Sequence, residues 1–403
     1  MLAVTLASPL VASAASLTSA AASTVKSSAY HVASAADPLK NHRITGYELK
    51  RARLHWPRLV GKNARLDVHG NGPTENVVVF ETSNGATGWG QIGWSPDDTR
   101  RVCDEVVGKT VADVLSPATG IRSDRWWPVD VALHDLAAVI REEPVWKMLG
   151  GGDAPLEMKI YSGMVYFDDL EPTDNPAGLD KVLENAKWDY DYGYRQLKVK
   201  IGRGNRWMDA EDGLQRDIDV IKMLHEELPD CELLVDGNDG FTADSFIKFL
   251  EGISPIPLFF IEEPFRETAA DWRKLADWCK SNGYEKTLRA DGEADPDFAC
   301  MRELEADGTL TLRLTDIIGG GFSTWRHWMP GLQKQGVVVS PHTWGSGLKT
   351  VYAAHFGAGY GDMPTVEGVT CSDEDVDFGE NKIIKNGLYQ VSSEPGFGLK
   401  LRS

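Results

Sequence analysis

The stretch that decides the fold is residues 195–202, which read RQLKVKIG. Basic and apolar residues alternate in it, and a period of two residues is typical of a β-strand. Lys198 and Lys200 therefore project from the same side of this strand. Two adjacent ammonium groups repel, so we expect each to lower the pKa of the other towards the range of a general base. The alternative is an edge strand with solvated lysines, and the segments that follow decide between the two.

Short β-like runs alternate with amphipathic helical patterns from residue 158 onward. The β-like runs are 158–163, 196–201, 233–236, 258–261, 287–290, 310–314, 337–340 and 365–366. Helical patterns at 217–227, 243–251 and 270–281 lie between them. This alternation predicts a parallel sheet, and eight repeats predict an α/β fold with a closed (β/α) barrel of the TIM type over residues 153–375.

An α+β domain is predicted before the barrel, over residues 44–152. Residues 77–82 read as a strand, Asn84-Gly85 as a hairpin turn, and residues 86–90 as the start of the return strand. A helix with one apolar face follows Pro128. The glycine run at 150–152 marks the boundary with the barrel.

The two ends of the chain are predicted separately. Residues 1–43 form a signal-like or disordered segment rich in Ala and Ser. The apolar run 2–11 followed by Ala12-Ser13-Ala14 resembles an export signal, although no Lys or Arg precedes Lys26. We expect an exported, periplasmic protein if this is a signal peptide, and a cytoplasmic one otherwise. The C-terminal segment, residues 376–403, is expected to pack back on the first domain.

Composition excludes several classes of function. The net charge of −18 argues against a general nucleic-acid or anionic-membrane binder, although it permits a small anionic substrate in a cleft lined by lysines and a metal. No segment is long enough to span a bilayer. The five cysteines include no C-x-x-C pair, so neither a zinc site nor a disulfide framework is predicted.

Several of the β-like runs end on a residue that can carry chemistry. These residues are Lys200, Asp236, Glu262, an acid of the pair Asp291 and Glu293, Asp316, His342 and Glu367. They follow one another at intervals of 23 to 36 residues when Glu293 is counted, about one βα unit each. In a barrel the carboxyl ends of the strands meet at one face, so these side chains are expected to converge there.

The chemistry of these residues sorts them into two groups. Asp236, Glu262 and one acid of the fifth strand form a cluster of three carboxylates, which would repel unless a divalent cation binds. Hard oxygen ligands favour Mg²⁺ over zinc. Asp316 and His342 lie on adjacent strands, where a carboxylate can orient the imidazole and favour its protonated form. A histidine that only packs in the core is the alternative for His342.

Taken together, these motifs resemble the enolase superfamily, and within it the mandelate racemase subgroup. The resemblance begins near Ile44, includes residues 79–90 and 131–152 (VALHDLAAVIREEPVWKMLGGG), and extends through the barrel. There it rests on Lys198-x-Lys200, Asp236-x-Asn238, Glu262-Glu263-Pro264, Gly292-Glu293, Asp316 and His342. Other subgroups carry a lysine at the end of the sixth strand. Residues 312–316 (LRLTD) have none, which favours the His-Asp type.

The resemblance implies a modified TIM barrel with an N-terminal capping domain, and it implies roles for the residues. Asp236, Glu262 and Glu293, preferred to Asp291, would bind Mg²⁺. Lys200 would be a base assisted by Lys198, and His342, held by Asp316, would act from the other side of the substrate. Glu367 would be neutral or hydrogen-bonded at the substrate carboxylate, and Asn238 would support the metal or the substrate. Homo-oligomers are common in the family.

The implied reaction starts with removal of the proton α to a carboxylate. Loss of a β-hydroxyl would then dehydrate a sugar acid to a 2-keto-3-deoxy acid, which we rank first. Return of the proton from the opposite face would instead give a racemase or epimerase of a 2-hydroxy acid. A sugar-acid binding protein without turnover is a third, less favoured interpretation. Tyr161, Tyr166 and Trp344 near the strand ends suit a polyhydroxylated substrate or, equally, the packing of the barrel.

Overall fold

The structure is a computed structural model that describes residues 37–93, 95–152, 157–293, 295–361 and 363–402. Of the segment predicted to be signal-like or disordered, residues 1–43, the part up to residue 36 lies outside the described residues. The remainder is ordered, contrary to that prediction: Pro38–Asn41 form a 3₁₀ turn in which Leu39 is completely buried. Asp37–Ser403 form one compact unit. Among the described helices, none combines the length and apolar character that crossing a membrane requires.

The first domain is built on an antiparallel sheet of three strands, in the order β1 (Ile44–Arg53), β2 (Thr74–Thr82) and β3 (Thr87–Gln91). The predicted hairpin is present, and Gly85 takes the positive φ of 79° that its turn requires. The domain also contains α1 (Pro96–Val106), α2 (Val111–Val114), α3 (Asp130–Ile140), α4 (Val145–Met148) and the short pair β4 (Leu115–Ser116) and β5 (Gly120–Ile121). Pro128 lies in a 3₁₀ turn, Asp124–Val129, which leads directly into α3.

The barrel contains the eight predicted strands. They are β6 (Met158–Val165), β7 (Gln196–Lys200), β8 (Glu232–Asp236), β9 (Leu258–Glu262), β10 (Leu288–Asp291), β11 (Leu312–Arg313), β12 (Val338–Val339) and β13 (Val366–Gly368). They pair in parallel in the order β13-β6-β7-β8-β9-β10-β11-β12. The predicted α/β barrel with a preceding α+β domain is therefore confirmed. At the seam between β12 and β13 the described residues show no backbone ladder; the Ser340 hydroxyl donates to the Thr365 carbonyl oxygen at 2.9 Å.

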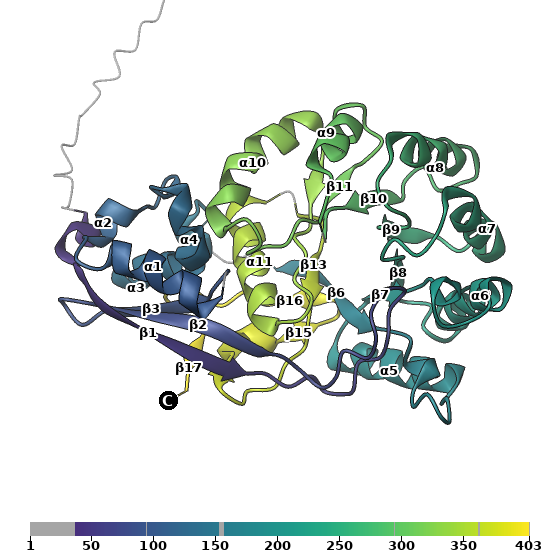
Figure 1. Ribbon diagram of the computed structural model, residues 1–403, viewed down its shortest axis with the longest axis horizontal. Coiled ribbons are helices and arrows are strands. Elements are labelled where there is room, and N and C mark those ends of the chain that lie inside the picture. Colours follow the sequence, from purple (N-terminus) through teal and green to yellow (C-terminus); the bar gives the residue numbers. More distant parts are fainter. Residues whose placement is uncertain (1–36, 94, 153–156, 294, 362, 403) are drawn as a thin grey trace, which may run out of the picture. The chain divides into compact units, whose positions relative to one another are not determined.

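Helices cover the outside of the strands (Figure 1). They are α5 (Leu179–Tyr192), α6 (Ala210–Glu227), α7 (Ala243–Ile253), α8 (Ala269–Ser281), α9 (Phe298–Ala306), α10 (Phe322–Gln335) and α11 (Gly347–Tyr360). The main apolar core lies between strands and helices, and a smaller cluster that includes Tyr161, Leu234 and Phe260 fills the barrel interior. Alternate residues of β7 face these two environments, which directs both lysines inward.

The C-terminal segment contacts both parts of the molecule. The hairpin β15 (Ile384–Lys385) and β16 (Leu388–Tyr389) pairs with the start of β6, and β17 (Lys400–Leu401) pairs with β14 (Val376–Asp377). The Phe397 amide donates to Asp135 of α3 at 2.9 Å, and the Leu399 carbonyl accepts from the Trp89 indole of β3 at 3.3 Å.

Candidate active site

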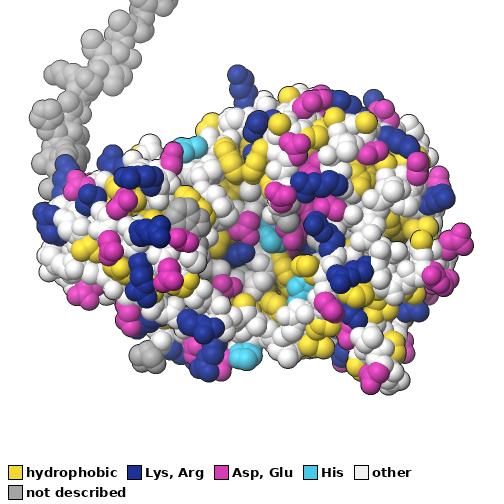
Figure 2. All heavy atoms as spheres, in the orientation of Figure 1, with side chains coloured by type: hydrophobic (Ala, Val, Ile, Leu, Met, Phe, Trp, Pro, Cys, Tyr) yellow, Lys and Arg dark blue, Asp and Glu magenta, His cyan; other side chains and the backbone are white. Residues whose placement is uncertain are grey.

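Parallel register aligns three of the predicted residues at the carboxyl ends of their strands. Lys200 of β7 pairs with Asp236 of β8, and Asp236 pairs with Glu262 of β9. All three side chains are almost completely buried. Figure 2 shows acidic, basic and histidine side chains gathered in a hollow between the first domain and the barrel.

Carboxylates surround both lysines of β7. Lys198 Nζ lies 2.9 Å from Glu262 Oε2, 2.8 Å from Glu367 Oε1 and 3.3 Å from Asp236 Oδ2. Lys200 Nζ contacts the same oxygen of Asp236. The lysines are therefore held by a shared network of carboxylates rather than solvated at a sheet edge.

The lysines repel as predicted, since Lys198 lowers the pKa of Lys200, but the surrounding carboxylates raise both pKa values away from the range of a general base. Burial is the largest single effect and lowers the pKa of Lys200, but Asp236, Tyr166 and Glu293 together outweigh burial and raise the pKa above its ordinary value. For Lys198, Glu262 and Glu367 likewise outweigh burial, so its pKa is raised strongly. The expected net shift towards neutral pH was wrong because it considered only the two ammonium groups and not the acids that face them.

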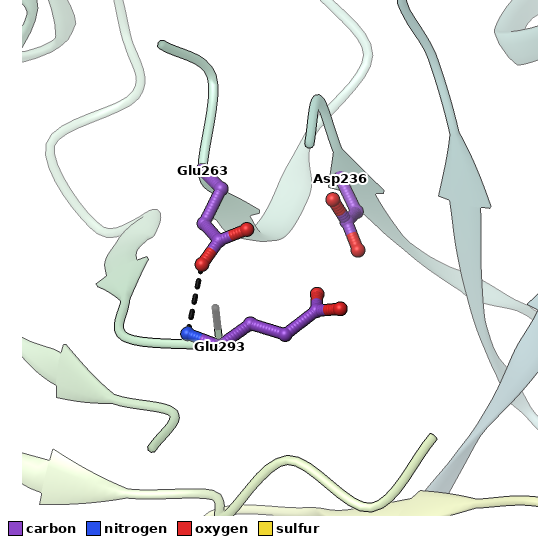
Figure 3. A group of neighbouring side chains, drawn as sticks. All are labelled: Asp236, Glu263 and Glu293. Carbon is purple, nitrogen blue, oxygen red and sulfur yellow. Dashed lines mark hydrogen bonds between the residues drawn. The ribbon is translucent and has the colours of Figure 1, made fainter. Parts of the chain in front are cut away.

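Three carboxylates at the strand ends form a group able to hold a metal ion. Single oxygens of Asp236, Glu263 and Glu293 all lie within 4.8 Å of one another. Asp236 ends β8, Glu263 follows β9 and Glu293 follows β10, and Figure 3 shows the carboxylates of Asp236 and Glu293 turned towards each other. The carboxylate of Glu263 also accepts the amide of Glu293 at 2.8 Å.

The composition of this group differs from the predicted one at a single position. The sequence predicted Glu262, whereas the structure places Glu263 in the group and pairs Glu262 with Lys198. Glu263 belongs to the motif Glu262-Glu263-Pro264, but the sequence predicted no role for it, because Glu262 is the acid that ends the strand. Asp291 is not in the group, and its Oδ2 accepts the indole of Trp272 at 3.0 Å, so the structure brings Glu293 rather than Asp291 to the cluster.

The donor set of this region fits a hard divalent cation. Carboxylate oxygens are the ligands that Mg²⁺ prefers. Asn238 donates to Glu293 Oε2 at 3.4 Å, and its buried Oδ1 has no hydrogen-bond partner among the described residues. Burial and, after it, the neighbouring Asp236 carboxylate raise the pKa of Glu262 to about 8.

His342 and Asp316 form the predicted contact. The two residues are joined by a parallel β-bridge, and His342 Nδ1 lies 3.1 Å from Asp316 Oδ2. The other ring nitrogen, Nε2, lies 3.3 Å from Glu293 Oε1. Burial lowers the pKa of His342, but Glu293 and Asp316 raise it to about 10, so the imidazole is protonated at neutral pH.

Glu367 is ionised, which contradicts our prediction of a neutral carboxyl. Burial raises its pKa, but Lys198 and His342 outweigh burial and lower it below the ordinary value. Its Oε2 accepts the amides of Thr343 at 2.6 Å and Trp344 at 2.9 Å. The alternative prediction, that Glu367 hydrogen-bonds to the substrate carboxylate, stays a prediction.

Aromatic side chains lie next to Lys200. The ring centroids of Tyr166 and Trp344 lie 4.7 Å apart, and Lys200 Nζ lies 5.3 Å from the centre of the Tyr166 ring. His69 comes from the segment between β1 and β2, and its ring centroid lies 4.9 Å from that of Tyr166. Its Nδ1 lies 2.7 Å from the carbonyl oxygen of Gly61. His69 was not among the predicted residues, because it belongs to no motif and reaches the site only through the fold.

Comparisons with known proteins agree with this architecture. A family model described as enolase C-terminal domain-like matches residues 181–403. The 3,6-anhydro-α-L-galactonate cycloisomerase of Streptomyces coelicolor is 32% identical over 273 residues, which cover 62% of this chain and 69% of the relative. The arabinonate dehydratase of Saccharolobus solfataricus is 24% identical over 357 residues, covering 82% of this chain and 89% of the relative.

Solved structures give the same result. A mutant of galacturonate dehydratase from a Geobacillus species, complexed with Mg, superposes with a TM-score of 0.83 at 26% identity. The match covers 90% of this chain and 93% of that one. The family model spans more than half of the sequence. The chain therefore belongs to the enolase superfamily.

Proposed function

We propose that the protein dehydrates a sugar acid to a 2-keto-3-deoxy acid in a reaction that requires Mg²⁺. One observation carries the proposal: a lysine and a histidine approach the same acidic cluster from different strands. Lys200 reaches Asp236 from β7, and His342, beyond β12, reaches Glu293. The similarity to arabinonate dehydratase and galacturonate dehydratase supports the choice of substrate class and reaction.

In this reaction Lys200 and His342 each transfer one proton. Lys200, as a neutral amine, takes the proton from the carbon next to the carboxylate, and the C–O bond at the next carbon breaks. His342 gives its proton to the departing hydroxyl, which leaves as water. The electron pair of the broken C–H bond forms the double bond of an enol, which tautomerises to the keto acid.

The substrate carboxylate has to be neutralised while negative charge develops beside it. Mg²⁺, when bound by Asp236, Glu262 and Glu293, would supply positive charge there. The ammonium of Lys198 adds to it from β7. Lys200 has to lose a proton first, and its contact with Asp236 opposes that loss, an effect that a cation sharing this carboxylate would weaken.

A second function is a racemase or epimerase of a 2-hydroxy acid. The observation that favours it is the same pair of proton-transfer groups, because Lys200 and His342 come from separate strands and could serve opposite faces of one carbon. A binding protein without turnover is less favoured, because each acid, base and candidate ligand type is retained. The expected homo-oligomer stays a prediction.

A panel of hexonates, pentonates and aldarates, incubated with the protein and Mg²⁺ in D₂O, separates these functions. We expect a keto acid product from at least one compound. Deuterium uptake at the α carbon without a keto product would defeat dehydration and favour the epimerase. No reaction and no exchange with any compound would remove both enzymatic proposals.

Two substitutions test the roles of the bases. We expect Lys200→Ala and His342→Asn each to lower kcat of the dehydration by about 10²-fold or more, since general acid–base groups contribute about 10²- to 10⁴-fold. Thermal unfolding and Mg²⁺ titration should show that both variants fold and bind the ion. Lys334→Ala, at an exposed lysine in the last turn of α10, is the control. Near-normal turnover in either active-site variant would remove the role assigned to that residue.

A further inference from the structure

Lys349 is a largely buried lysine next to the candidate site that the sequence motifs do not include. It lies in the first turn of α11, and its side chain is only 15% exposed. Its Nζ lies 2.7 Å from Asp316 Oδ2 and 3.5 Å from the carbonyl oxygen of Trp344. A buried ammonium without a partner is strongly unfavourable, so the contact with Asp316 is needed to compensate.

Four hydrogen-bond donors contact the carboxylate of Asp316. Its Oδ1 accepts the amides of Ile318 at 2.9 Å and Gly319 at 3.0 Å. Its Oδ2 is shared between Lys349 and His342 Nδ1. Four donors on two oxygens leave the carboxylate one orientation, and that orientation determines where the imidazole points.

Charged groups from three other elements face Lys349. Burial lowers its pKa, but Asp316, then Glu75 of β2 and Glu367 of β13 outweigh burial and raise it. The side chain is therefore an ammonium. Because Glu75 belongs to the capping domain, charge from that domain also acts on this lysine.

We propose that Lys349 is a positioning residue, which holds Asp316 so that His342 presents Nε2 to the acidic cluster. The proposal rests on the proposed function, because a positioning role for His342 has a kinetic effect only if His342 takes part in turnover. A lysine that merely anchors α11 would affect stability and leave the action of His342 intact. The two roles therefore predict different measurements.

Kinetics of five variants separate the two roles. With a compound that the panel identifies as a substrate, we expect Lys349→Met to lower kcat by about 10- to 100-fold and to change KM less than about threefold. Lys349→Arg should recover part of the loss, and the exposed Lys334→Met should have none. The double variant Lys349→Met/His342→Asn should be no slower than His342→Asn alone, because a residue that acts through His342 has no effect without it. Multiplied losses in the double variant would overturn the proposal.

A second measurement does not depend on turnover. In protein with ¹⁵N-labelled histidine, the ring nitrogens of His342 are identified by their loss in His342→Asn. We expect their chemical shifts to change in Lys349→Met and to stay unchanged in Lys334→Met; unchanged shifts in Lys349→Met would overturn the positioning role. If Lys349→Met does not fold, Lys349→Gln, which keeps a donor without the charge, is taken through the same series. Failure of the whole panel with the wild-type protein would count against the proposed function alone, because the NMR comparison still decides the role of Lys349.

Discussion

Single residues in this site take their properties from the side chains that face them. Lys198 and Lys200 were predicted from alternation within one strand, and the structure confirms that both point into the barrel. Their raised pKa values come from Asp236, Glu262 and Glu367, which lie on three other strands. The residue types and the directions of the lysine side chains could therefore be predicted from the local sequence, whereas their protonation states could not.

The two consecutive glutamates Glu262 and Glu263 provide a test at the residue scale. We expect Glu262→Gln to weaken Mg²⁺ binding by about 100-fold or more and Glu263→Gln by about 10-fold, as measured by calorimetry. Glu262 ends β9 in register with Asp236, while Glu263 supports the amide of Glu293 and so acts behind a ligand. Loss of a group behind a ligand costs about 10- to 100-fold in affinity.

Thermal unfolding of both variants without Mg²⁺ controls for misfolding. The reverse order of affinities would assign the ion to the group that Asp236, Glu263 and Glu293 form in the structure.

Among the elements of the capping domain, β3 packs closely against α3. A Cβ on Gly88 would lie 2.3 Å from Leu136 Cα and 2.4 Å from Leu136 N, both backbone atoms that a side-chain rotation cannot move. The strand can approach the helix this closely only without a side chain at that position. Gly90 meets Ala132 of the same helix in a similar way, at 2.9 Å from its backbone N.

We expect Gly88→Ala to lower the free energy of unfolding by about 1–3 kcal/mol, as overpacking typically does, measured by urea denaturation. Gly46→Ala on β1 is the matched control, because nothing lies within 4 Å of its added Cβ and its φ is not positive. It should be neutral or slightly stabilising. Equal stability of the two variants would show that β3 and α3 can separate without cost.

At the scale of the whole molecule, a single carboxylate joins the capping domain to the end of the chain. Asp135 of α3 accepts the amide of Trp89 in β3 and the amide of Phe397 in the C-terminal segment, each at 2.9 Å. Burial raises the pKa of Asp135 to about 7, although the two amide hydrogen bonds lower it. This junction should therefore respond to pH.

The sign of the response follows from the raised pKa. Below about pH 4 Asp135 is protonated in both the folded and the unfolded chain. Between about pH 4 and 7 only the unfolded chain loses the proton, so the contribution of Asp135 to the free energy of unfolding falls with rising pH, by about 4 kcal/mol at most. We expect the stability of the wild type, minus that of Asp135→Asn, to decrease over this range in denaturant titrations. Parallel pH profiles would contradict the raised pKa.

The strands, their order and the residue types at their ends follow from local patterns in the chain. Periodicity and spacing are local properties, and parallel strands bring their carboxyl ends to one face whatever the loops contain. The contacts of Lys349 with Asp316, the place of Glu263 in the acidic group and the approach of His69 to Tyr166 depend on atoms that meet only after folding. Electrostatic energy depends on distance through space rather than along the chain, so the charges of the lysines and of Glu367 were decided by the tertiary structure.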